Sequence, residues 1–282
     1  MALVTLEALM KKALAEHYGV GMFNVVNLEF AEAIIQAAEE LGAPVILGLP
    51  ERFFAFVEME DLGHLCVGMA RRARVPVAVH LDHGKSFETV MKAIRYGFSS
   101  VMFDGSALPY EENIRQTAEI VRAAHAVGVS VEGELGYIGR AHTDAAAVEY
   151  DASLFTRPEA AEDFVNRTGV DALAIAIGTI HGVYRSAPRL DFQRLAAIRQ
   201  SVPVGLVLHG GSGLADSDFQ RAVSLGINKI NIFTELSLCA MNHVKEALPT
   251  AESWLEVAGS LRAALKEVVR NRIVIFGGVG EA

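Results

Sequence analysis

Short apolar runs that alternate with longer amphipathic stretches constrain the fold of this chain more than any other feature. Such runs are typical of buried strands, and strands separated by helices pair in parallel with both faces of the sheet covered. Eight runs are present, and eight parallel strands are the number that closes a (β/α)8 TIM barrel. The expected strands are residues 20–26, 44–49, 76–81, 100–103, 130–135, 172–177, 204–208 and 229–233.

Helical periodicity fills the intervals between these strands and both ends of the chain. An N-terminal helix is expected over residues 3–16. A C-terminal helical extension is expected over residues 235–282, broken near Pro249 and closed by an apolar tail that starts at residue 273. No linker rich in Pro, Gly or Ser divides the chain, so residues 1–282 are expected to form a single α/β domain. An open, doubly wound sheet is the alternative, but it would gather its functional loops at one switch point.

The charge balance limits the partners of this protein. The net charge of −9 at pH 7 provides no basic field for nucleic acid or an anionic membrane surface, so a small-molecule ligand is expected. No apolar stretch could span a bilayer and the N-terminus lacks a secretion pattern, so a cytoplasmic protein is expected. Cys66 and Cys239 lie far apart in helical patterns and are expected to be buried thiols without a disulfide.

Three histidines stand where expected strands open into loops. His83 follows the third strand, His181 the sixth and His209 the seventh. The carboxyl ends of barrel strands meet at one mouth, where barrel enzymes keep their active sites. Neutral imidazole suits zinc, and a catalytic zinc commonly has three protein ligands and one open position. The histidines therefore predict one metal site, with hydrogen-bonded core or loop histidines as the alternative.

Two loops late in the chain predict a phosphate site. Residues 209–214 follow the seventh strand and contain Gly210, Gly211 and Ser212, and residues 231–235 close the eighth strand at the start of a helix. Glycines let backbone N–H groups approach an anion, and a helix N-terminus adds a favourable dipole. The loops after strands seven and eight are the usual phosphate site of this fold. A Gly-rich turn without a ligand is the alternative.

Two carboxylates end neighbouring expected strands. Asp104 closes the fourth strand and Glu134 the fifth. We interpret them as hydrogen-bond acceptors for metal-bound histidines or as ligands of a second cation, with helix caps or solvated loop acids as the alternative. His80 is interpreted as a packing residue beside the metal site rather than as a fourth ligand.

Taken in order, these motifs resemble the zinc-dependent class II aldolases, in the group that acts on fructose and tagatose bisphosphates. The resemblance spans nearly the whole chain, and the combination of motifs is highly specific although no single motif is. The matching stretches are Phe23-Asn24 and residues 80–84, 103–106, 111–114, 134–136, 176–182, 208–213 and 231–235.

The resemblance implies an activity and a set of ligands. Such an aldolase cleaves or forms a ketose 1-phosphate, with dihydroxyacetone phosphate as the donor, through a zinc-stabilised ene-diolate. His83, His181 and His209 would hold one catalytic Zn²⁺ per subunit. Asp104 and Glu134 would line a second cation position. The substrate-binding residues would be Asn24, Gly182, Gly210, Gly211, Ser212, Asn231, Ile232, Phe233 and Thr234.

Asp82 would be the catalytic acid of such an enzyme. In condensation it would protonate the nascent hydroxyl, and in cleavage it would remove the proton of that hydroxyl. The resemblance also implies a phosphosugar substrate and a homodimer or homotetramer.

The chain departs from the family pattern in three places. The loop over residues 137–150 lacks the usual pair of acids, so Asp144 and Glu149 are the candidates for the base that removes the ketone-side proton. The small residues of this loop suit a mobile lid. Residues 48–54 replace a serine-containing stretch, and Lys85-Ser86 follows the metal motif. These changes alter the acceptor side and leave the donor side intact.

We therefore hypothesise an acceptor other than glyceraldehyde 3-phosphate, such as a sugar-acid or another aldehyde. A basic side chain would pair with its carboxylate, and solvated surface charges are the alternative interpretation of these residues. Three other functions remain open: a conventional fructose- or tagatose-1,6-bisphosphate aldolase, a zinc hydrolase on the same barrel, and a non-catalytic phosphosugar-binding protein. The acceptor-side candidates are Arg52, Lys85, Arg140 and Arg185.

Overall fold

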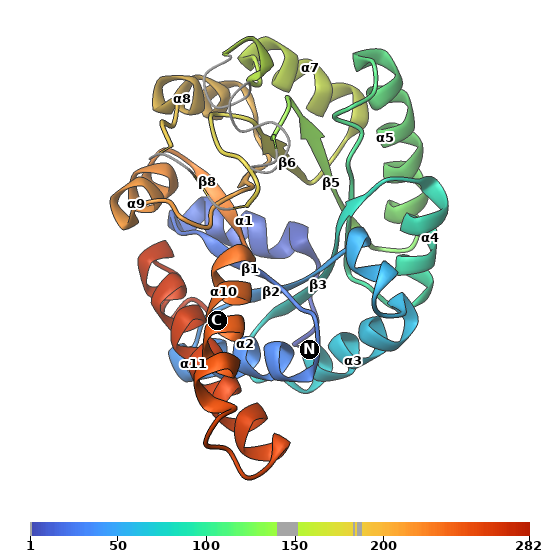
Figure 1. The fold of residues 1–282 in the computed structure, drawn as a ribbon. Helices are drawn as coiled ribbons and strands as arrows, with labels where there is room; N and C mark the ends of the chain where they lie inside the picture. The colour runs from blue at the N-terminus through green and yellow to red at the C-terminus, as the bar shows by residue number, and fades with distance from the viewer. Residues whose placement is uncertain (1, 140–151, 183, 185–187) are drawn as a thin grey trace.

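Eight parallel strands form a closed barrel in the computed structural model, and each strand pairs with its neighbours in chain order (Figure 1). The structure describes residues 2–139, 152–182, 184 and 188–282. The strands are β1 (Val20–Asn24), β2 (Val45–Pro50), β3 (Val77–Gly84), β4 (Ser100–Phe103), β5 (Ser130–Leu135), β6 (Ala172–Ile175), β7 (Gly205–Leu208) and β8 (Ile227–Ile232). β8 closes the barrel against β1, with Asn231 opposite Met22. The predicted (β/α)8 barrel is confirmed.

Most strands differ from their predicted bounds by one to three residues, and the largest difference, at the end of β3, lies at the site. β3 continues to Gly84, beyond its predicted end at residue 81, and its pairing with β4 shifts register between Leu81 and Gly84. β8 begins at Ile227 rather than at residue 229. A register shift of this kind interrupts the regular alternation of side chains and is frequent next to active sites. His83 lies within the shifted segment.

Helices cover the outside of the barrel, as the alternating pattern predicts (Figure 1). Several begin at a side-chain cap: the Asn27 side chain accepts a bond from Phe30 N at 3.2 Å, and Ser86 Oγ accepts one from Thr89 N at 3.1 Å. The described helices are α1 (Leu6–Glu16), α2 (Leu28–Leu41), α3 (Met59–Arg72), α4 (Phe87–Arg95), α5 (Tyr110–His125), α7 (Pro158–Thr168), α8 (Phe192–Ser201), α9 (Asp216–Ser224), α10 (Thr234–Ala247) and α11 (Trp254–Phe276), with 3₁₀ segments η1 (Glu51–Ala55) and η2 (Ala152–Leu154).

The barrel interior changes from apolar to polar along its axis. The N-terminal helix α1 packs against the interior, where Leu6 and Met10 join a buried cluster that includes Ala78 of β3. Alternate residues of a strand point to the same face, so His80 and Asp82 follow Ala78 on the inner side. Both are buried, at 0% and 4% exposure. The other strand face packs on the surrounding helices and forms the larger apolar core.

The C-terminal helices lie on one side of the barrel. α11 packs along α2, and the segment that joins α10 to α11 projects away from the barrel (Figure 1). The predicted break near Pro249 is present, because α10 ends at Ala247 and α11 begins at Trp254. The apolar residues after position 272 continue α11 to the buried Phe276 instead of forming a separate tail.

Two further expectations concern cysteines and membranes. Neither cysteine forms a disulfide, and Cys66 is buried as predicted. Cys239 is only partly buried, so the prediction of a buried thiol was wrong there, because few residues of α10 face the core. None of the described helices combines the length and apolar character of a membrane span.

Candidate metal centre and active site

A cavity of about 780 Å³ opens at the C-terminal ends of the barrel strands. Its volume is typical of small-molecule sites. Loops that follow different strands build its walls, so residues far apart in the chain share one space. The predicted site residues that line it are Asn24, Arg52, Asp82, His83, Lys85, Asp104, Glu134, His181, Gly182, Gly210, Ser212, Asn231, Phe233 and Thr234.

The three predicted metal-binding histidines meet at the wall of this cavity, which His83 and His181 line and behind which His209 is buried. The Nε2 atom of His83 lies 3.2 Å from Nε2 of His181 and 3.1 Å from Nδ1 of His209. Tetrahedral zinc with Zn–N bonds of about 2.0–2.1 Å keeps its ligand nitrogens roughly 3.3 Å apart. The spacing of the three rings therefore suits ligands of one ion.

Hydrogen bonds on the far sides of two rings select the nitrogen that faces the centre. Nδ1 of His83 lies 2.8 Å from Oδ2 of Asp104, so this carboxylate accepts the ring N–H. Nε2 of His209 lies 2.9 Å from Oε1 of Glu132 in the same relation. In the neutral rings the inward nitrogens carry lone pairs, which repel one another unless a cation lies among them. The donor set fits a metal ion with carboxylates orienting its ligands.

The backbone of His83 is held in an unusual conformation. Its φ angle is 51°, in the left-handed region that residues with a side chain seldom adopt. Such strain persists only where the surroundings over-determine it, and it gathers at functional sites. Here the register shift of β3 and the bond to Asp104 impose it.

The electrostatic field of the centre favours one positive charge. Burial alone would lower the pKa of His83, but the neighbouring acids, with Asp82 the strongest, outweigh it and raise that pKa to about 9. Burial and the positive charge at His83 lower the pKa of His181 and that of His209. A proton or a metal ion supplies the favoured charge.

Asp104 and Glu134 lie side by side next to His83. Oδ2 of Asp104 is 2.8 Å and Oε2 of Glu134 is 3.5 Å from the His83 Nδ1 atom. Oδ1 of Asp104 accepts bonds from the backbone N and Oγ of Ser106 at 3.2 and 2.6 Å. Burial would raise the pKa of Asp104, but His83 and Lys85 hold it well below its usual range. Burial and the charge of Asp104 raise the pKa of Glu134 to about 8.

Asp82 is an oriented, buried carboxylate. Its Oδ2 atom accepts a bond from Asn24 Nδ2 at 3.1 Å, and its Oδ1 atom accepts one from Asn231 Nδ2 at 3.2 Å. Burial would raise its pKa, but His83, His209 and Lys229 hold the pKa well below its usual range. The carboxylate is therefore ionised and aimed into the cavity, in a state suited to accept a proton.

A buried ion pair beneath the histidines was missed by the sequence analysis. The Lys229 Nζ atom lies 2.9 Å from Oε2 of Glu132, and both side chains are fully buried. Lys229 also donates to Oδ1 of Asn231 at 2.9 Å, which turns the Asn231 amide toward Asp82. Alternation could have placed Glu132 on the face of Glu134 and Lys229 on that of Asn231.

Removing the charge of Lys229 is expected to destabilise the fold strongly. Lys229→Met leaves Glu132 buried without its counter-charge, and breaking one side of a buried pair costs about 3–5 kcal/mol. Urea unfolding measures this loss of unfolding free energy. The matched control is Lys92→Met, which removes an exposed lysine paired with Glu88 on α4 and is expected to leave the midpoint unchanged. Equal midpoints for both variants would contradict the assigned role.

The two loops predicted to bind phosphate lie against each other. The Ser212 Oγ atom accepts bonds from the backbone N atoms of Phe233 and Glu235, both at 3.3 Å. α10 begins at Thr234, so its N-terminus opens at the cavity. Gly210 has a φ of 67°, and a Cβ there would meet Ile180 O at 2.4 Å, so a side chain is not tolerated.

Three other residues predicted to bind phosphate differ in how they are placed relative to the cavity. Gly182 lines the cavity with a φ of 107°. Gly211 is buried beside the cavity but is not part of its lining. The Ile232 side chain is buried in the core between barrel and helices, which leaves its backbone as the part available to a ligand.

Two of the acceptor-side candidates lie within the described residues. The Arg52 guanidinium of η1 lies 5.2 Å from the ring centre of Phe53 and 5.6 Å from that of Phe233, which places it at the rim next to the phosphate loops. The Lys85 Nζ atom donates to Oδ2 of Asp104. The other candidates, Arg140 and Arg185, and the base candidates, Asp144 and Glu149, lie outside the described residues.

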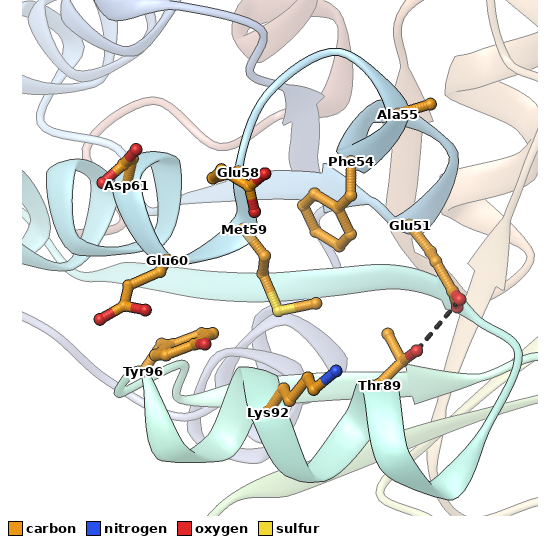
Figure 2. Close-up of a pocket in the computed structure, with 10 residues that line it drawn as sticks. All are labelled: Glu51, Phe54, Ala55, Glu58, Met59, Glu60, Asp61, Thr89, Lys92 and Tyr96. Atoms are coloured by element: carbon orange, nitrogen blue, oxygen red, sulfur yellow. Dashed lines mark hydrogen bonds between the residues drawn. The ribbon is translucent and has the colours of Figure 1, made fainter.

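A second hollow of about 550 Å³ lies next to η1 (Figure 2). Its lining includes several acids of η1 and the start of α3, together with Lys92 and Tyr96 of the α4 region. Within the described part of the chain, no group of histidines, cysteines or acids converges there closely enough to hold a metal ion. Glu51 lines both hollows and bonds to Thr89 Oγ1 at 3.1 Å (Figure 2).

Comparisons with known proteins match the chain from end to end. The family model described as fructose-bisphosphate aldolase class-II matches residues 4–281. The fructose-bisphosphate aldolase of Thermus caldophilus is 46% identical over 306 residues, covering 99% of this chain and 100% of that protein. YdjI of Escherichia coli strain K12 is 44% identical over 271 residues, covering 95% of each chain. The crystal structure of the YdjI aldolase superimposes with a TM-score of 0.89 at 40% identity and 99% coverage of each chain.

The closed barrel and the polar residues at its mouth are those of a TIM-barrel enzyme. The histidines and carboxylates at this mouth are residue types that bind metal ions. The family match extends over nearly all of the chain, and the relatives align along their full lengths. The protein belongs to the class II fructose-bisphosphate aldolase family and is a lyase. Zinc dependence is general in this family.

Proposed function

We propose that this enzyme reversibly cleaves a ketose 1-phosphate into dihydroxyacetone phosphate and an aldehyde that is not glyceraldehyde 3-phosphate. The observation that carries the proposal is the buried Asp82 carboxylate beside three imidazole rings whose inward nitrogens converge. A carbon–carbon bond next to a ketone breaks when one group removes a hydroxyl proton and a cation draws charge toward the ketone oxygen. The Asp82 carboxylate supports the first requirement, and the three neighbouring histidines support the second.

His83, His181 and His209 would hold one divalent ion, which we propose to be zinc. When bound, the ion supplies Lewis-acid polarisation of the ketone. Asp104 and Glu132 support this role because they accept the outward N–H groups of two of the rings. Their negative charges also favour a cation at the centre.

Asp82 would move the proton of the acceptor half. In cleavage, one carboxylate oxygen takes the hydroxyl proton, the adjacent carbon–carbon bond breaks, and its electron pair remains on the donor half. The amides of Asn24 and Asn231 hold the carboxylate from both oxygens, which fixes its aim. In condensation Asp82 returns the proton. The donor half exchanges its own proton with another base, for which Asp144 and Glu149 are our candidates.

The donor phosphate would bind at the loops after β7 and β8. The N-terminus of α10 opens at the cavity beside Ser212 and Thr234 and offers a favourable dipole to an anion. Gly182 and Gly210 leave room for the phosphate because neither carries a side chain. Asn24 lines the same cavity on the side of Asp82.

The acceptor is proposed to be an aldehyde with a carboxylate at its far end, as in a sugar acid. Arg52 lies at the rim of the cavity and offers a planar, permanently charged fork that matches a carboxylate. Arg140 and Arg185 remain further candidates. The conventional fructose- or tagatose-bisphosphate reaction is the second candidate, because relatives of this chain carry the name fructose-bisphosphate aldolase.

We also propose a homodimer or homotetramer. Several large apolar side chains of α10, α11 and their connection are exposed, which a subunit contact would cover. Light scattering on the purified protein measures the mass of the assembly, and a monomer would contradict the proposal. The exposed side chains are Leu238, Met241, Leu248, Trp254 and Leu255.

Two assays test the function. The enzyme is expected to exchange the C3 proton of dihydroxyacetone phosphate with deuterated solvent, because the donor half is activated without an acceptor. It is also expected to cleave sugar-acid ketose 1-phosphates faster than fructose or tagatose 1,6-bisphosphate. Preference for the bisphosphates would establish the conventional reaction. A hydrolase would show no exchange, and a binding protein would bind phosphosugars tightly without cleavage.

A further inference from the structure

The acid pair beside the histidines has the form of a second cation site. Ligand atoms of His83, Asp104 and Glu134 lie within 4.8 Å of one another. The side chains of both acids are almost fully buried, at 6% and 2% exposure. Among the described residues, the Glu134 Oε2 atom has no hydrogen-bond partner. Two buried acids at this spacing repel each other when both are ionised, so a cation beside them would stabilise the ionised pair.

A cation of the chain itself already reaches this pair. The Lys85 Nζ atom donates to Oδ2 of Asp104, the same oxygen that accepts the His83 N–H. Asp104 in turn lies next to Glu134, since both carboxylates approach the His83 Nδ1 atom, at 2.8 and 3.5 Å. The Lys85 ammonium is therefore located at the acid pair.

The backbone that carries Lys85 is tied down on its other side. The Lys85 N–H donates to Oε2 of Glu51 at 2.5 Å. The second oxygen of Glu51 accepts a bond from Thr89 Oγ1 at 3.1 Å, as the dashed line in Figure 2 shows. Glu51 thus joins η1 to the start of α4 and holds the turn between β3 and α4, which contains Lys85. Because the backbone of Lys85 is fixed, its side chain can explore only a small volume. The effective concentration of the ammonium beside Asp104 is therefore high.

We propose that the Lys85 ammonium is a built-in cation of the Asp104–Glu134 pair, so that each chain takes one divalent ion at its three histidines and no second ion at the acids. This inference deepens the proposed metal-dependent function and rests on it. A second ion would have to displace the ammonium from Asp104 and would place two divalent charges on opposite sides of one imidazole. A neutral residue at position 85 would leave the acid pair open to an external cation.

Metal counting tests this directly. The wild type, Lys85→Ser and Lys85→Met would each be equilibrated with a series of free Zn²⁺ concentrations and analysed for bound metal per chain. Lys85→Ser removes the charge and opens space, whereas Lys85→Met removes the charge and keeps a long side chain. We expect one ion in the wild type and a second, weaker ion in Lys85→Ser. Lys85→Met is expected to show the second ion too, at a lower affinity.

Lys92→Met is the matched control, because it removes a lysine of the adjoining helix α4 whose ion pair among the described contacts is with Glu88 on the surface. It is expected to bind one ion, like the wild type. The half-exposed Lys85 side chain makes folded variants the expected outcome, and circular dichroism verifies this. Two ions in the wild type, or one ion in both Lys85 variants, would overturn the inference.

The same proteins separate failure of the inference from failure of the proposed function. Metal counts of one in the wild type and two in Lys85→Ser, without cleavage of any ketose 1-phosphate, would refute the function and leave the cation assignment intact. Cleavage by a wild type that holds two ions would do the reverse. If the Lys85 variants keep one ion and raise only KM for sugar-acid substrates, Lys85 binds the acceptor carboxylate instead, and the cation assignment is wrong.

Discussion

Replacement of His83 with alanine is expected to remove the bound metal and the activity together. The His83 Nε2 atom stands at 3.2 and 3.1 Å from the ligand nitrogens of His181 and His209, so it belongs to both close pairs of the centre. Without it, two imidazoles remain, and Asp104 loses the imidazole that it orients. We expect less than one-tenth of the wild-type metal and a fall in kcat/KM of at least about 10³-fold. Metal analysis and steady-state kinetics on one preparation measure both.

His125→Ala is the matched control for this experiment. His125 Nε2 lies 2.8 Å from Asp171 Oδ2, so the variant also deletes an imidazole bound to a carboxylate, but at the end of α5 and away from the cavity. It is expected to keep wild-type metal and activity. A His83→Ala protein that retained a full complement of tightly bound metal would show that the three histidines are not the ligands.

Asp82→Ala is expected to separate the two halves of the reaction. The variant removes the carboxylate that Asn24 and Asn231 hold, but it leaves in place the three histidines proposed as metal ligands. Loss of a positioned general acid–base group lowers the rate by about 10²–10⁴-fold. We therefore expect cleavage to fall by this factor, while bound metal and proton exchange of dihydroxyacetone phosphate with solvent stay close to wild type.

Three measurements on Asp82→Ala check this assignment: metal content, cleavage rate and the exchange of the donor proton followed by NMR. His83→Ala serves as the contrast, because it should lose all three. If Asp82→Ala abolished donor exchange while zinc stayed bound, Asp82 would act on the donor proton, and its proposed role on the acceptor half would be wrong. An undiminished cleavage rate would exclude it from the proton transfers altogether.

Much of the architecture could be predicted from local patterns. Each strand of a parallel barrel is a short apolar run. Such a run can be recognised from its own residues, without knowledge of the residues that it contacts in the fold. The same locality placed His83, His181 and His209, since each follows its own strand directly. Parallel strands in a closed barrel all end at one mouth, so three strand ends imply one site before any contact is known.

The buried partners could not be predicted in the same way. The alternation of side chains along β8 predicts that Lys229 faces the barrel interior. Its pairing with Glu132 depends on the curvature of the closed barrel, which the local sequence does not reveal. Lys85 was interpreted as an acceptor-side cation, and the structure places its ammonium on Asp104. A flexible charged side chain can reach many positions, and the surrounding chain decides which one it occupies.

Composition, periodicity and the residue types at strand ends were sufficient to predict the barrel, its mouth and the family resemblance, and to propose the histidine ligands and the phosphate loops. These features depend on the alternation of side chains along each strand and on the chemistry of single groups, both of which are local. The tertiary structure alone decided the strained backbone of His83, the buried charges under the histidines and the aim of Asp82. Those features arise when closure of the barrel removes water from charged groups of different strands, which then must satisfy one another.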